Sequence, residues 1–340
     1  MSVKRDSLVD CLKGYACILV VLDHVLLGLE NALGVANISS FALFTEDFIG
    51  KFHVALFMFL SGYVFNITGG VEKRGLWRTL LHKLINIGVP YFAFSAIYIM
   101  LNSLVGSGVN TAFKASSILT LWYKPVAQYW FLYALMLLFI CYSVLSTIMP
   151  KTFSMIALFL VYLLSHYVGV SIGVFSAASN VALVFGLGFC AETIDFSNVK
   201  IRYRLLFGAF CMVCLMVIVN LKVDIPQTCQ IVGICGSIAI VSVVINNDRI
   251  KEILLFVCKY SLPIYLLQPI YLLHTIFTSA VRIVLMKFGV RVYILHLIAG
   301  IISGFAFPII VGYFMKKSVW LELLLYPSAT YRKLSEKEKK

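Results

Sequence analysis

The chain has 340 residues, of which 61% are hydrophobic and only 13% are charged, and its mean hydropathy is +0.96. A water-soluble domain of this length does not require so apolar a composition, which excludes the ordinary soluble classes. The net charge of +13 does not indicate a nucleic-acid partner, because the basic residues are spread over short segments between apolar stretches. The sequence therefore predicts an all-α polytopic membrane protein.

Continuous apolar stretches of about 20 residues favour transmembrane helices over barrel strands, which alternate apolar and polar residues. These stretches predict a bundle of about ten helices. Their expected positions are residues 11–30, 48–67, 84–104, 128–148, 153–169, 178–194, 203–221, 229–246, 254–277 and 292–315.

With a cytoplasmic N-terminus, most of the 28 Lys and Arg residues fall on the inner side, so both termini are predicted to be cytoplasmic. The basic outer loop Arg282–Arg291 is the exception. We expect residues 1–315 to form one transmembrane domain and residues 316–340 a basic cytoplasmic tail.

The first apolar helix contains ionisable residues that a bilayer disfavours. An ionisable residue near the bilayer centre costs roughly 2.5 to 3.5 kcal/mol, so such residues usually face the interior of a helix bundle. Lys13 and His24 lie nearly in line on a helix, and Asp10 is within about 40° of that line. His24 would lie roughly 16 Å beyond Lys13, past the membrane midpoint. Asp23 points about 100° away from His24 and therefore cannot orient it.

The second span contains a histidine and a Ser-Gly pair. His53 is expected at a depth similar to that of His24, either as a second polar group of a site or as a structural histidine. Ser61 and Gly62 are expected in the inner third of the membrane. The missing side chain of Gly62 would admit a thin acyl chain close to the backbone, or it would serve ordinary helix packing; the spacing leaves both open.

A basic cluster follows the second span at the predicted cytoplasmic side. Lys73, Arg74 and Arg78 would suit a phosphate-rich cofactor, although positive-inside topology alone also produces such clusters. Neither GxGxxG nor GxxxxGK occurs, so a nucleoside-triphosphate mechanism has no basis. The nine cysteines all fall inside apolar segments, and we expect no disulfide framework and no metal site.

Four segments together match one known pattern. They are Lys13-x10-His24 preceded by Asp10, FHVALFMFLSGY from Phe52 to Tyr63, Trp130-Phe-Leu, and SLPIYLL from Ser261 to Leu267. This set resembles the membrane acyltransferase-3 family, whose members transfer acyl groups, commonly acetyl, to carbohydrates and lipid-linked glycans. Two positions differ from the family pattern: Lys13 stands where arginine is frequent, and Gln268 stands where many relatives have histidine before proline.

The resemblance implies a function and a set of site residues. The protein would be a multi-pass O-acetyltransferase of the bacterial inner membrane that moves an acyl group from acetyl-CoA in the cytoplasm to a polysaccharide, O-antigen or lipid-linked sugar hydroxyl outside. The catalytic residues would be His24, Lys13 and Asp10, with His24 acting as base or as acyl carrier. The donor would be bound by Lys73, Arg74, Arg78, Ser61 and Gly62, and the acceptor by His53, Asp23 and Trp130.

A transporter is the alternative reading of the first helix. Protons or an anionic substrate would pass along Lys13, Asp23 and His24. That class predicts interrupted helices in matching places of two halves, and the sequence shows no such repeat. The partners expected are the lipid bilayer and a glycan or lipid-linked oligosaccharide acceptor, with no nucleic acid; a homo-oligomer is compatible with the sequence. The acceptor sugar and the acyl chain are not specified by it.

Overall fold

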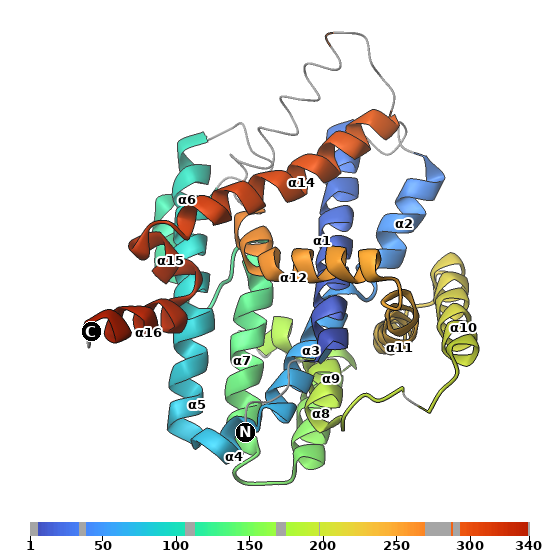
Figure 1. The fold of residues 1–340 in the computed structure, drawn as a ribbon, viewed down its shortest axis with the longest axis horizontal. Coiled ribbons are helices and arrows are strands. Elements are labelled where there is room, and N and C mark those ends of the chain that lie inside the picture. The colour runs from blue at the N-terminus through green and yellow to red at the C-terminus, as the bar shows by residue number, and fades with distance from the viewer. Residues whose placement is uncertain are drawn as a thin grey trace. The chain divides into compact units, whose positions relative to one another are not determined.

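The computed structural model describes residues 6–33, 39–105, 113–167, 175–196, 198–268 and 293–338, and Lys287 by itself. Every regular element within these ranges is a helix (Figure 1), as the apolar stretches predicted. The helices group into two compact units. The first comprises Met1–Lys73, Leu145–Val168 and Ser179–Ser261, and the second comprises Arg74–Val144, Gly169–Ala178 and Leu262–Lys340.

Seven helical segments in the described ranges, some made of more than one helix, are long and apolar enough to cross a membrane, which confirms a multi-pass membrane protein. They are Ser7–Glu30, Ser40–Ile67, Leu76–Leu104, Ala127–Leu145, Ile201–Asn220, Pro226–Val244 and Tyr293–Met315. Two further predicted spans correspond to the shorter apolar helices Lys151–Tyr167 and Ala178–Cys190. The predicted span 254–277 begins in α12 (Asp248–Leu267) and runs outside the described residues, as does the loop Arg282–Arg291 apart from Lys287. A total of ten spans and the cytoplasmic termini stay predictions.

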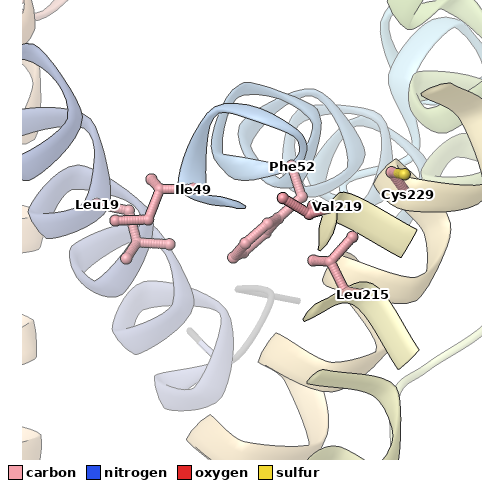
Figure 2. Close-up of a cluster of buried hydrophobic side chains, with 6 residues drawn as sticks. All are labelled: Leu19, Ile49, Phe52, Leu215, Val219 and Cys229. Atoms are coloured by element: carbon pink, nitrogen blue, oxygen red, sulfur yellow. The ribbon is translucent and has the colours of Figure 1, made fainter. Parts of the chain in front are cut away.

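The first unit is assembled around α1 (Ser7–Leu33), which packs against α2 (Ser40–Gly50), α3 (His53–Ile67) and α11 (Pro226–Val244). Helix α10 (Ile201–Asn220) lies against α11 and α2. A buried cluster joins four of these helices (Figure 2), and it consists of Leu19, Ile49, Phe52, Leu215, Val219 and Cys229. The unit also contains α8 (Lys151–Tyr167), most of α4 (Gly70–Arg74) and α9 (Ser176–Cys190), and α12 up to Ser261. Around Leu19, α1 is therefore held by apolar packing on its neighbours.

The second predicted span consists of two helices rather than one. Helix α2 ends at Gly50, and α3 begins at His53 after a turn in which the Phe52 N–H donates to the Ile49 carbonyl at 3.1 Å. The Phe52 side chain is 1% exposed, and it occupies the space where a side chain at Gly233 of α11 would otherwise lie. Burial of this aromatic ring against a glycine fixes the break, and hydropathy along the chain does not reveal it.

The second unit is built on a long helical segment interrupted by a π-helical turn. Helix α5 (Leu76–Lys83) continues through η2 (Leu84–Gly88) into α6 (Val89–Val105). The unit also contains η4 (Ala115–Thr120), η5 (Ala127–Tyr129), α7 (Trp130–Leu145) up to Val144, and α14 (Tyr293–Met315). A π-helical turn inside an α-helix is uncommon and often marks a functional position.

Two further helices occupy the segment that the sequence predicted as a basic tail. Helix α15 (Val319–Leu325) and helix α16 (Pro327–Glu338) follow α14 directly (Figure 1). They pack against each other, and they contact α6 and η2 respectively. Leu325 is 1% exposed, and Pro327 begins α16, a position where proline suits a helix start. The described part of this segment is therefore folded onto the second unit.

Candidate functional site

Lys13 and His24 lie on one uninterrupted helix. Because α1 runs unbroken from Ser7 to Leu33, the two residues are separated by about 16 Å along its axis. Both side chains are partly exposed. Two side chains so far apart cannot bond to each other, so they can act only on different parts of a ligand or at different steps.

Asp10 lies where α1 crosses α12. Its Oδ1 accepts a long hydrogen bond from the Cys258 thiol, with 4.0 Å between the two atoms. One turn further along α1, a side chain at Gly14 would collide with the Leu254 carbonyl of α12. Asp10 and Gly14 of α1 thus face Cys258 and Leu254 of α12 where the two helices cross (Figure 1). The side of α1 that carries Asp10 and Gly14 is therefore partly a helix-packing face.

Asp23 and His53 face each other between α1 and α3. His53 Nδ1 is 2.9 Å from the Ile49 carbonyl oxygen, and because a carbonyl only accepts, this nitrogen must bear a proton. The other ring nitrogen, Nε2, is 3.9 Å from Asp23 Oδ2. Asp23 is 7% exposed and His53 is 5% exposed. In this buried setting, a neutral imidazole would direct the lone pair of Nε2 toward an ionised carboxylate, which is repulsive. We therefore infer that the pair holds one proton more than a neutral His53 beside an ionised Asp23 would hold.

The second carboxylate oxygen of Asp23 faces α2. Oδ1 is buried, and among the described residues it has no hydrogen-bond partner. A side chain built on Gly50 would come within 3.7 Å of it. An unsatisfied buried oxygen costs about 1–3 kcal/mol, so it is a strong acceptor for any hydroxyl that reaches it. This half of Asp23 is available for a ligand donor.

Ser61 and Gly62 serve local and packing roles in this structure. Ser61 Oγ donates to the Phe57 carbonyl within the same helix at 2.8 Å. A side chain at Gly62 would overlap the Phe185 carbonyl of α9, and one at Gly188 of α9 would overlap the Phe59 carbonyl of α3. The α9 backbone thus fills the space in which the sequence allowed an acyl chain. Of the two readings of Gly62, helix packing is the one that this geometry supports.

The three predicted donor-binding cations are all exposed. Lys73 and Arg74 are consecutive in α4, and Arg78 is in α5. Glu72, the carboxylate beside them, binds Lys151 with 3.0 Å between Oε1 and Nζ. Within the part of the chain that the structure describes, no ion pair joins the three cations to a carboxylate. Their charges are therefore available to an anionic ligand.

Trp130 begins α7 beside a reciprocal pair of tyrosine bonds. The Tyr129 hydroxyl donates to the Leu266 carbonyl at 2.8 Å, and the Tyr265 hydroxyl donates to the Gln128 carbonyl at 2.5 Å. These bonds tie η5 to the end of α12 within the second unit. They give a rigid base to Trp130, whose side chain is partly exposed.

Comparison with known proteins decides the family. The family model described as "Acyltransferase domain" matches residues 7–313. The chain belongs to the acyltransferase-3 family. In this acyltransferase the match extends from the start of α1 almost to the end of α14, and α15 and α16 lie beyond it. No curated protein and no solved structure matches the chain.

Metal chemistry has no ligand set in the described part of this acyltransferase. No group of three or more His, Cys, Asp or Glu residues is placed there to hold an ion. All nine cysteines are free thiols inside or at the ends of apolar helices.

Two polar residues of this acyltransferase were missed by sequence reasoning. Asn86 lies in the π-helical turn η2, and Tyr129 lies in η5 with its side chain fully buried. A polar residue in an apolar stretch was the available signal for Asn86, but the partner it binds is distant in the chain. Neither residue has neighbours in sequence that predict its role.

Proposed function

We propose that this acyltransferase is an O-acetyltransferase of the bacterial inner membrane. It takes the acetyl group of acetyl-CoA at the cytoplasmic side and transfers it to a hydroxyl of a polysaccharide, O-antigen or lipid-linked oligosaccharide at the outer side. The supporting observation is that α1, inside the matched acyltransferase domain, holds Lys13 and His24 about 16 Å apart on one helix that is long and apolar enough to cross a membrane. Intramembrane ionisable groups at such positions are functional in most membrane proteins.

His24 is the proposed catalytic residue. Its imidazole removes the proton from the acceptor hydroxyl while the oxygen attacks the thioester carbonyl; the C–S bond breaks, and the coenzyme A thiolate takes up a proton. In the two-step route the imidazole first accepts the acetyl group and then passes it to the hydroxyl. A burst of released coenzyme A without acceptor distinguishes the two routes. Lys13 stabilises the negative charge of the donor from the cytoplasmic end.

The remaining residues divide between the two substrates. Arg74, Arg78 and Lys73 supply exposed positive charge for the phosphates of acetyl-CoA, since arginine pairs bidentately with phosphate oxygens. Asp23 offers its unpartnered Oδ1 to an acceptor hydroxyl, and His53 Nε2 lies 3.9 Å from the other oxygen of that carboxylate. Trp130, partly exposed at the start of α7, supplies an aromatic face for a sugar ring.

A proton-coupled transporter is the second candidate. The observation that favours it is the buried Asp23 and His53 pair, because a pair that holds one proton is also suited to proton passage. The two candidates differ in what happens to the donor. An enzyme releases free coenzyme A on the side where the donor was added, whereas a transporter carries an intact substrate across.

Sealed proteoliposomes of known orientation separate the two functions. Labelled acetyl-CoA is supplied on the cytoplasmic side and a glycan acceptor on the other. Label in the glycan, with no intact acetyl-CoA in the acceptor compartment, supports the acetyltransferase. Intact donor on the far side supports the transporter. Mass spectrometry of surface glycans with and without the gene then identifies the gain of one acetyl group.

A further inference from the structure

A single asparagine attaches α16 to the π-helical turn η2. Asn86 Nδ2 donates to Ser328 Oγ at 2.7 Å and to the His82 carbonyl at 2.7 Å, while Asn86 Oδ1 accepts from the Ser328 N–H at 3.3 Å. The first N–H groups of a helix have no acceptor within that helix, so Asn86 caps α16 from a different helix. The π-helical turn places Asn86 at this contact, and the capping bond fixes the start of α16 against η2.

This contact brings two helical turns alongside each other. His82 lies four residues before Asn86 on one side, and Arg332 lies four residues after Ser328 on the other. Residues four apart occupy one face of a helix, so His82 and Arg332 lie on the faces that make the contact. The positive charge of Arg332 acts on the His82 ring, in agreement with this placement. The C-terminal helix therefore brings an arginine to the end of α5.

Cations from three elements lie near enough to His82 to act on it electrostatically. Besides Arg332, the charges of Arg74 from α4 and Lys83 from α5 act on the His82 ring. Arg78 lies four residues before His82 and extends the positive face along α5. Arg74, Arg78, Lys83 and Arg332 are here called the Arg332 cluster. Its three arginines are exposed to solvent, so an ion from water can reach them.

Two carboxylates of the adjoining helices, Glu322 and Glu72, are engaged elsewhere, whereas Glu336 lies four residues after Arg332 on α16 and is in no ion pair among the described residues. Lys333 binds Glu322 of α15 at 2.5 Å, so this lysine faces α15 rather than the Arg332 cluster. Glu72, in the same helix as Arg74, binds Lys151. Among the residues that the structure describes, no ion pair joins an arginine of the Arg332 cluster to a carboxylate. Like charges gathered in this way favour binding of an anion, and guanidinium groups match the oxygens of phosphate.

We propose that the Arg332 cluster binds the phosphate groups of the acyl-CoA donor, with Arg332 of α16 as an additional donor-binding residue. This inference rests on the proposed function, because it takes acyl-CoA as the donor. Helix α16 lies beyond residues 7–313, so the contribution of Arg332 comes from the C-terminal extension of this chain and not from the matched acyltransferase domain. Phosphate is also present in lipid head groups, and the experiment below distinguishes the two sources.

The test measures coenzyme A binding to the full chain in nanodiscs of zwitterionic lipid. Arg332→Ala is compared with wild type, with Arg332→Lys, and with the matched control Lys333→Ala, which removes the neighbouring cation that faces Glu322. Loss of one bidentate phosphate contact is expected to weaken coenzyme A binding about tenfold. Arg332→Lys keeps the charge and is expected to lose less, and Lys333→Ala is expected to stay within twofold of wild type. Thermal unfolding of each variant checks that α16 remains folded.

Each outcome decides the proposal. A selective loss in Arg332→Ala, partly restored in Arg332→Lys, supports it. Equal affinities of Arg332→Ala and Lys333→Ala for coenzyme A overturn it. If coenzyme A binding is unchanged while Arg332→Ala weakens retention on phosphatidylglycerol vesicles, the cluster binds lipid head groups and the proposal is wrong. If the wild-type protein binds no coenzyme A, acetyl-CoA is not its donor, and the proposed function is wrong as well. This result differs from a failure of Arg332 alone, in which the wild-type protein still binds coenzyme A.

Discussion

The carboxylate of Asp23 and the imidazole of His53 face each other across 3.9 Å, from two helices whose packing buries both residues. The Ile49 carbonyl fixes the tautomer of His53 by accepting from its Nδ1–H. Asp23 precedes the catalytic candidate His24 in α1, and His53 begins α3 directly after the break between α2 and α3. Their contact therefore links the two places. It makes the pair a structural element of the site.

Asp23 and His53 should be energetically coupled. Asp23→Asn or His53→Gln alone leaves a buried partner unsatisfied and is expected to lower the free energy of unfolding by about 1–3 kcal/mol. The double variant should lose less than the sum of the two single losses. Unfolding of all three variants in nanodiscs measures the coupling. Asp47→Asn, which breaks the exposed ion pair between Asp47 and Lys51, is the control and should change stability little. Additive effects in the cycle would contradict this coupling.

His24→Ala should abolish acetyl transfer and leave folding intact. A positioned general base contributes about 10²–10⁴ in rate, so the acetylation rate should fall by that factor. The measurement is glycan acetylation by the purified variant, with thermal unfolding as a check on folding. Leu27→Ala on the same helix removes an exposed apolar side chain and is the matched control. Near-normal acetylation by His24→Ala would eliminate the mechanism.

Gly62→Ala and Gly188→Ala should each destabilise the protein. The added methyl group would overlap the backbone of the facing helix, and overpacking of this kind costs about 1–3 kcal/mol. Gly28→Ala on α1 is the matched control, because no atom lies within 4 Å of the position its side chain would take. Thermal unfolding measures the three variants. An unchanged unfolding temperature for Gly62→Ala, together with lost acetylation, would instead place Gly62 in the binding site.

Charge reversal at Arg74 or Arg78 should raise KM for acetyl-CoA more than it lowers kcat. Contacts to donor phosphates are made in the ground state, so their loss acts mainly on binding. Steady-state kinetics in membrane vesicles separates the two constants. Arg202→Glu in α10 reverses an equally exposed arginine on the same predicted side of the membrane and should leave KM unchanged. Equal effects of all three reversals would reduce the basic residues to a topological role.

Lys13 should tolerate arginine better than alanine. If the requirement at this position is positive charge, Lys13→Arg keeps most of the acetylation rate and Lys13→Ala loses it. The comparison is made at saturating acetyl-CoA and again near KM. Equal losses in both variants would show that the ammonium geometry of lysine, rather than its charge, is required.

The sequence alone determined the class of the protein and the pattern on its first helix. Hydropathy is a property of consecutive residues, so the apolar stretches predicted helical spans correctly wherever the structure describes long apolar helices. The helical period is equally local, which is why the placement of Lys13 and His24 on one side of α1 followed from their spacing.

The tertiary structure decided everything that depends on which helices meet. Asp23 is near His53, Gly62 is covered by Phe185 of α9, and Asn86 holds Ser328 of α16, although no short-range pattern links these residues. Each contact depends on close packing of side chains from segments distant in the chain, and packing responds to the shape of both partners rather than to hydropathy. For the same reason the basic segment after α14, which reads as a solvated tail from its charge, forms α15 and α16 once Leu325 and Asn86 provide a buried contact and a cap.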